Sequence, residues 1–250
     1  MRGGRNIFPL LFSTKRTMSN VYRIADKNIK LNSLYSFVHV YCEKYRTDGE
    51  PDFEIEITCK DIDAERKTVK ADVTGGWLEI SAVYRKIAEI MPKYDTLMIH
   101  GSAISVDGEG YLFTAKSGIG KSTHVKLWQE LLGDRAVIVN DDKPFIRISE
   151  NEARVYGTPY CGKEGLNTNI SVPLKAICIL ERSEENRIEQ INFRETFPIL
   201  IQQTYHPSDR EMFDRTFNLL DKLKLFVKFY RLSCNKELEA AEISYSAMKG

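Results

Sequence analysis

Apolar and polar positions along the chain follow patterns that predict strands and helices in alternation. In the first half, VYRIADKNIKL, which begins at Val21, is typical of a strand, and NSLYSFVHVYCEKY has the apolar recurrence of a helix. The alternating run DFEIEIT, from Asp52, predicts a half-buried strand. The apolar recurrence of LEISAVYRKIAEIM predicts a second helix. Pro92 follows closely and marks the end of this helix.

The second half of the chain has clearer boundaries. TLMIHGSAISV and YLFTA are strand-length apolar runs joined by DGEG, which predicts a tight hairpin. KSTHVKLWQELL then places apolar side chains along one helical face and ends at Gly133. AVIVN and VPLKAICILE are continuously apolar, as buried strands are, and the loop-rich RVYGTPYCGKEGLNTN lies between them. The remaining sequence is largely helical in pattern.

The interleaving of strands and helices predicts an α/β or α+β layered fold with a mixed sheet and flanking helices. Residues 1–20 are expected to be an extension without stable structure, because they carry four basic and no acidic residues and only a short apolar run interrupted by Pro9. Residues 21–95 are expected to form N-terminal elements packed on a core, and residues 96–250 the core itself.

Composition narrows the possible partners. The chain of 250 residues has a formal net charge of +1, so it lacks the basic excess typical of nucleic-acid or membrane-surface binding. No apolar run is long enough for a membrane span or a secretory signal. The five cysteines include no C-x-x-C pair, which favours reduced thiols over a zinc site or a disulfide framework. We therefore expect a cytoplasmic protein with small-molecule or protein partners.

The segment AKSGIGKS departs by one residue from the phosphate-binding pattern G-x-x-x-x-G-K-[ST], because Ala115 stands at the first glycine. Two glycines still allow the tight turn that points backbone N–H groups at a phosphate, and a helix follows directly. The nucleotide-binding residues are predicted to be Ser117, Gly118, Ile119, Gly120, Lys121, Ser122 and Thr123. Lys121 is expected to reach the phosphates, and the Ser122 hydroxyl to bind Mg²⁺.

Two carboxylates, Asp141 and Asp142, follow the predicted strand AVIVN, where a metal-binding acid is needed. Successive strand residues point to opposite faces, so one is expected to hold Mg²⁺ and the other to face the acceptor alcohol. His100, on the strand predicted to pair with the one that enters the loop, is a further candidate. Lys163 is the one cation in YCGKEGLNTN, and we expect it to stabilise the transferring phosphoryl group.

The motifs HGSA, SGIGKS and VNDD, in this order and spacing, resemble those of the bacterial HPr serine kinase/phosphorylase catalytic domain, which is related in fold to the ATP-dependent PEP carboxykinases. The resemblance covers about residues 96–181. It implies a phosphate contact for Lys121, Mg²⁺ binding by Ser122 and Asp142, a base role for Asp141, and a position beside the transferred group for His100. The chain looks most like small HPr-kinase-like proteins associated with peptide-modification pathways.

These observations favour an ATP- and Mg²⁺-dependent kinase that transfers the γ-phosphoryl group to a hydroxyl, on a peptide serine or a small molecule. Two alternatives remain open. One is a carboxykinase-like lyase, which needs further metal ligands and an arginine-rich pocket. The other is a non-catalytic, nucleotide-gated module that binds a peptide. The sequence does not specify the acceptor or the oligomeric state.

Overall fold

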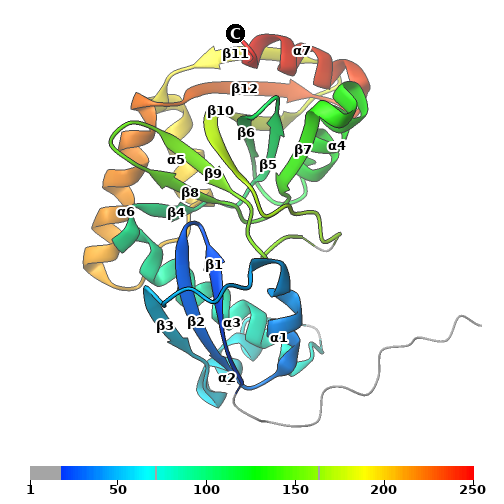
Figure 1. The fold of residues 1–250 in the computed structure, drawn as a ribbon. Coiled ribbons are helices and arrows are strands. Elements are labelled where there is room, and N and C mark those ends of the chain that lie inside the picture. The colour runs from blue at the N-terminus through cyan, green and yellow to red at the C-terminus, as the bar shows by residue number, and fades with distance from the viewer. Residues whose placement is uncertain (1–17, 71, 163) are drawn as a thin grey trace, which may run out of the picture. The chain divides into compact units, whose positions relative to one another are not determined.

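A computed structural model describes residues 18–70, 72–162 and 164–250, and Figure 1 shows its fold. The described residues form two compact units, which divide between Ile87 and Ala88. The sequence analysis placed this division between Asp95 and Thr96. Residues 1–17 and 163 lie outside the described residues, and so does most of the expected N-terminal extension.

The first unit consists of a three-stranded sheet and helices. Strand β1 begins at Met18, so the last three residues assigned to the extension belong to the sheet. The run predicted as one strand is a hairpin: β1 and β2 pair antiparallel, and Ala25 and Asp26 turn with φ of 48° and 60°. The elements are β1 Met18–Ile24, β2 Lys27–Ser33, α1 Ser36–Tyr41, β3 Phe53–Glu56, α2 Cys59–Arg66 and α3 Gly75–Ile90.

A buried carboxylate ties helix α3 to the chain that follows β2. Glu79 has no exposed surface, and its carboxylate accepts hydrogen bonds from the backbone N–H groups of Leu34 and Tyr35 at 2.5 and 3.0 Å. Burial raises the pKa of Glu79 above its ordinary value, and the two backbone donors oppose the shift.

The second unit is built on a mixed sheet whose described strands run in the order β4-β8-β9-β10-β6-β5-β7, with β12 also paired to β10 and β11 to β12. Strand β10 pairs in parallel with both β6 and β12, whereas β5 is antiparallel to both β6 and β7. The elements are β4 Thr96–Met98, β5 Ser102–Val106, β6 Glu109–Thr114, α4 Lys121–Leu132, β7 Ala136–Asn140, β8 Phe145–Ile148, β9 Ala153–Tyr156, β10 Ser171–Arg182, β11 Arg187–Ile191, α5 Phe193–Gln203, α6 Arg210–Lys222, β12 Lys228–Cys234 and α7 Leu238–Met248.

Helices cover both faces of this sheet, because side chains along each strand alternate between two cores. On β6, Leu112 joins a core that includes Leu200 of α5 and Leu219 of α6. Its neighbours Tyr111 and Phe113 join the opposite core, which includes residues of α4 and α7. The second unit is therefore a helix–sheet–helix sandwich, which confirms the predicted mixed α/β architecture.

Most of the predicted second-half elements are present, with one change that matters for the site. The run from Thr96 to Val106 is not one strand: it breaks after Met98, and β4 pairs with β8 while β5 pairs with β6. His100 thus lies in the break between β4 and β5 and not on the strand paired with β6. Among the described residues, no helix combines the length and apolar character needed to cross a bilayer.

Candidate functional site

Three strand ends meet at one edge of the sheet. Because β5 is antiparallel to both β6 and β7, the first residue of β5 lies beside the last residues of its two neighbours. The register pairs Ser102 with Phe113 of β6 and Ala103 with Asn140 of β7. The loop after β6 and the aspartates after β7 therefore emerge side by side. This edge also holds the carboxyl ends of the parallel strands β10 and β12, where open α/β sheets bind ligands.

The loop between β6 and α4 turns at two glycines. Gly118 and Gly120 have φ of 82° and 125°, which side chains with a Cβ rarely adopt. Nothing lies within 4 Å of a Cβ built on either residue, so the requirement for glycine comes from the backbone angle and not from crowding. Ala115 is buried and is not among the described residues with positive φ, so alanine fits the first position of the motif without strain.

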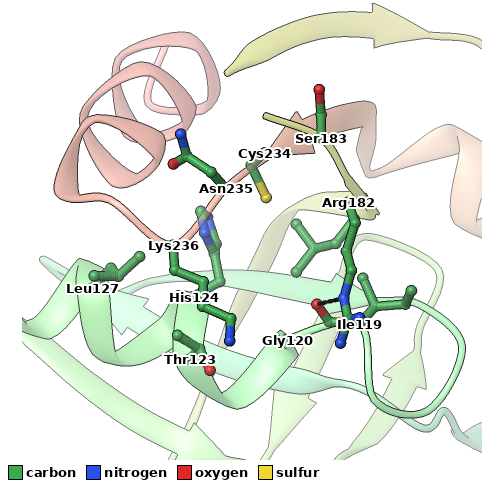
Figure 2. A pocket seen from close by; sticks show the side chains of 11 residues that line it. Ile119, Gly120, Thr123, His124, Leu127, Arg182, Ser183, Cys234, Asn235 and Lys236 are labelled. Carbon is green, nitrogen blue, oxygen red and sulfur yellow. Dashed lines mark hydrogen bonds between the residues drawn. The ribbon is translucent and has the colours of Figure 1, made fainter. Parts of the chain in front are cut away.

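Arg182, the last residue of β10, holds this loop from outside. Its guanidinium donates to the carbonyl oxygen of Gly118. It also donates, at 3.4 Å, to the carbonyl oxygen of Ile119 (Figure 2). A trans peptide points its N–H away from its carbonyl, so anchoring the Ile119 carbonyl turns the N–H of Gly120 to the opposite side. The clamp thus helps to direct backbone donors toward the inside of the loop.

Lys121 begins helix α4, and its ammonium group is folded back into the loop. The residue is 8% exposed, and Nζ donates to the carbonyl oxygen of Ala115 at 3.1 Å. Burial lowers the pKa of Lys121 below its ordinary value, while the carboxylates of Asp142 and Asp141 oppose that shift. A buried ammonium at a helix N-terminus is an arrangement that binds anions.

Asp141 is buried beside the loop. Its Oδ1 accepts a hydrogen bond from Ser102 Oγ at 2.8 Å, and the Ser122 hydroxyl also donates to its carboxylate. Burial raises the pKa of Asp141; the two hydroxyls oppose the rise, and the nearby charges of Glu164 and Asp142 add to it. The residue after the motif lysine is therefore in contact with the first aspartate of the pair.

Asp142 faces a different neighbour. Its Oδ1 lies 3.3 Å from His100 Nε2, and its Oδ2 lies 3.6 Å from the ammonium of Lys143. Burial opposes ionisation of Asp142, but the hydrogen bond from His100 and the charge of Lys143 outweigh it and hold the pKa below its ordinary value. The other ring nitrogen of His100, Nδ1, contacts Gln203 Oε1 at 2.9 Å.

The Asn140 side chain shapes the turn that separates the two aspartates. Its Oδ1 accepts hydrogen bonds from the backbone N–H groups of Asp142 and Lys143 at 2.9 and 2.7 Å, and its Nδ2 donates to the carbonyl of Thr158. Such an Asx turn reverses the chain within two residues. The two carboxylates diverge because of this turn rather than because of strand alternation.

The long loop after β9 reaches the aspartates. A Cβ placed on Gly162 would lie 3.7 Å from the Asp141 carbonyl oxygen and 3.8 Å from Asp142 Cβ. The carbonyl of Leu166 accepts from the Asp141 N–H, and Glu164 forms an ion pair with Lys126 of α4. Lys163, which the sequence analysis assigned to the transferring group, lies outside the described residues, but the residues on either side of it are at the site.

The structure brings together Lys121, Ser122, Asp141, Asp142 and His100, as the sequence analysis expected. Ser122 interacts with Asp141, whereas the resemblance implies that Ser122 shares Mg²⁺ with Asp142. The sequence analysis missed two residues, Ser102 and Arg182. Ser102 follows HG in the HGSA motif, which is a usable signal, whereas nothing in the sequence near Arg182 marks its contact with a loop more than sixty residues away.

The oxygen donors at the edge of the sheet fit a hard divalent cation. Ser122 and Asp141 present a hydroxyl and a carboxylate that already touch each other, and Asp142 is ionised beside them. No group of three or more His, Cys, Asp or Glu side chains able to hold a metal occurs in the described ranges. Mg²⁺ does not need one, because it commonly uses one or two carboxylates together with substrate phosphates and water.

Comparisons with known proteins place the chain in a family. No curated protein matches it. Among solved structures, the "Structure of the Hpr(Ser) kinase/phosphatase from Coxiella burnetii" aligns with 12% sequence identity over 61% of this chain and 99% of that chain, with a TM-score of 0.32. At that TM-score the likeness does not establish a common fold. Residues 65–206, more than half of the chain and including the whole site, match the family model described as SynChlorMet cassette protein ScmC, and the chain therefore belongs to that family.

Proposed function

We propose that the chain is a kinase that uses a Mg²⁺-bound nucleoside triphosphate, ATP by expectation, to phosphorylate a hydroxyl group. One observation carries the proposal: the buried ammonium of Lys121 and the contact between Ser122 and Asp141 lie together where the glycine loop enters helix α4. A cation, a hydroxyl and a carboxylate in this arrangement form the phosphate and metal site of kinases that bind the nucleotide phosphates with a glycine-rich loop.

The phosphates would occupy the loop formed by Ser117, Gly118, Ile119 and Gly120 and the first turn of α4, Lys121 to Thr123. Backbone N–H groups and the positive end of the helix favour the negative charge, and Lys121 would exchange the Ala115 carbonyl for a phosphate oxygen. Replacing a neutral acceptor with an anionic one strengthens its hydrogen bond. The phosphate also provides a negative charge to pair with the buried ammonium of Lys121.

Ser122 and Asp141 would hold Mg²⁺, which when bound neutralises phosphate charge during the transfer. This assignment follows their contact and differs from the pairing of Ser122 with Asp142 that the resemblance implies. The base role moves correspondingly from Asp141 to Asp142. In phosphoryl transfer the main task of this carboxylate is to orient the attacking hydroxyl, so a carboxylate with a lowered pKa is suitable.

Asp142 and His100 would then face the acceptor. Their side chains are about one third exposed, unlike the buried Asp141, so an incoming hydroxyl can approach them. With Nδ1 against Gln203, His100 keeps Nε2 directed at Asp142 and the reacting group. Lys163 stays a proposed partner of the transferring phosphoryl group, supported by the position of its neighbour Gly162 beside both aspartates.

The acceptor class remains a hydroxyl, on a peptide serine or on a small molecule, and the test is arranged so that the acceptor need not be known. Binding of Mg²⁺·ATP is measured by isothermal titration calorimetry, and release of labelled phosphate to water is measured as background turnover. We expect saturable binding that needs Mg²⁺ and a loss of both signals in Lys121→Ala. The matched control is Lys222→Ala, an exposed lysine at the end of α6, which should keep both. Absence of ATP binding by the parent chain would exclude the proposal.

A further inference from the structure

A pocket of about 390 Å³ adjoins the glycine loop. It lies between the first turns of α4, the end of β10 and the segment that follows β12 (Figure 2). Its volume falls within the range of roughly 300–1,000 Å³ typical of small-molecule sites. Ile119, Gly120 and Thr123 line the pocket and also belong to the loop and the first helical turn, so one ligand can occupy both.

The pocket has apolar walls and a positive rim. Ile119, Leu127 and Leu180 supply apolar surface, which suits a flat aromatic group. Arg182 and Lys236 are the two cations, and none of the eleven lining residues is acidic. Figure 2 shows the Lys236 side chain extending from the segment after β12 toward the first turn of α4. This charge pattern suits an anion with an attached apolar ring and disfavours a cationic ligand.

His124 has one ring nitrogen whose hydrogen-bonding capacity is unused within the described ranges. It is 2% exposed and lines the pocket, and Nδ1 has no hydrogen-bond partner among the described residues. The tautomer follows from Ser244, whose single hydroxyl proton goes to the Ala240 carbonyl at 2.7 Å. Ser244 Oγ must therefore accept from His124 Nε2 at 3.1 Å, which leaves Nδ1 of the neutral ring as an acceptor.

When Nε2 carries the proton and donates it to Ser244 Oγ, Nδ1 is a hydrogen-bond acceptor. A buried acceptor without a donor costs free energy. A nucleoside carries such donors in its ribose hydroxyls and, for adenine, in an exocyclic amine. The unpaired Nδ1 of His124 and the apolar walls of the pocket thus both favour a nucleoside.

We propose that this pocket receives the nucleoside of the phosphate donor, with the base against Leu127 and Leu180 and with Lys236 near the phosphate next to the ribose. The inference rests on the proposed function, because it uses the glycine loop as the phosphate site. It adds residues that the loop motif does not include. It also explains why the loop, the end of β10 and the segment after β12 converge at one opening.

The test compares two probes that share the phosphates and differ in the nucleoside: Mg²⁺·ATP and Mg²⁺·tripolyphosphate, each titrated into the full chain. We expect ATP to bind at least tenfold more tightly. Leu127→Trp should remove this advantage and leave tripolyphosphate affinity unchanged, because the larger side chain fills the pocket and not the loop. Leu131→Trp is the matched control: Leu131 is partly buried on the same helix but does not line the pocket, so the advantage should persist.

The outcomes separate this inference from the proposed function. Equal affinities of the parent chain for the two probes would overturn the nucleoside pocket and leave the phosphate site standing, whereas binding of neither probe would overturn both. A second measurement does not depend on a variant that must fold: photolabelling of the parent chain with 8-azido-ATP should modify residues 123–127 or 234–236. Labelling confined to other segments would exclude the pocket.

Discussion

Nε2 of His100 lies 3.3 Å from Oδ1 of Asp142, while the adjacent Asp141 turns away and accepts a hydrogen bond from Ser102 at 2.8 Å. Two neighbouring carboxylates thus have separate surroundings: one is partly exposed beside a histidine, and the other is buried between two hydroxyls. Groups with such different environments serve different roles when they share a site.

Replacing each aspartate with asparagine should separate these roles. Asp142→Asn is expected to lower turnover by roughly 10²- to 10⁴-fold, as for loss of a base, with nearly unchanged Mg²⁺·ATP affinity. Asp141→Asn should instead weaken Mg²⁺·ATP binding by about tenfold or more, because it removes the charged ligand next to Ser122. Calorimetry and initial rates measure the two effects. The reverse pattern would restore the assignment implied by the resemblance, with the base at Asp141.

Two glycines of the long loop should respond differently to alanine. A Cβ on Gly157 would lie 1.8 Å from the Thr168 carbonyl oxygen and 2.7 Å from that of Val139, so the backbone must move. Gly157→Ala is expected to lower the free energy of unfolding by about 1–3 kcal/mol or more. Gly162→Ala meets its neighbours at 3.7 Å or beyond and should stay within about 0.5 kcal/mol of the parent. Urea denaturation measures both variants, and equal stabilities would contradict the crowding at Gly157.

The sequence analysis could group these candidate residues because they belong to short, contiguous motifs. The loop, its helix and the strand before Asp141 follow from glycine positions and apolar periodicity over a few residues each. The break between β4 and β5 was missed because the run through His100 is continuously apolar on both sides, while the pairing of β4 with β8 is decided by tertiary contacts. The Arg182 clamp and the pocket near Lys236 join segments distant in the sequence, which local patterns do not specify.

In the first unit, Glu79 should make stability depend on pH. Its folded-state pKa is raised above the ordinary 4.5, so the folded chain binds its proton more tightly than the unfolded chain does. This contribution to the free energy of unfolding is fully present below pH 4.5 and is lost as pH rises through the folded-state pKa. Urea denaturation at several pH values should show this decline in the parent and not in Glu79→Gln. The exposed Glu50→Gln is the control and should keep the decline.

The last prediction concerns the clamp on the glycine loop. Arg182→Ala removes the donors to the Gly118 and Ile119 carbonyls, so the loop loses the contact that orients its backbone N–H groups. Mg²⁺·tripolyphosphate affinity should fall by about tenfold, or about 1.4 kcal/mol, while the melting temperature changes little because Arg182 is exposed. Arg182→Lys should recover only part of the loss, since an ammonium lacks the planar fork that reaches two carbonyls. Arg187→Ala, an exposed arginine on β11, is the control. Full affinity in Arg182→Ala would show that the loop holds its shape without the clamp.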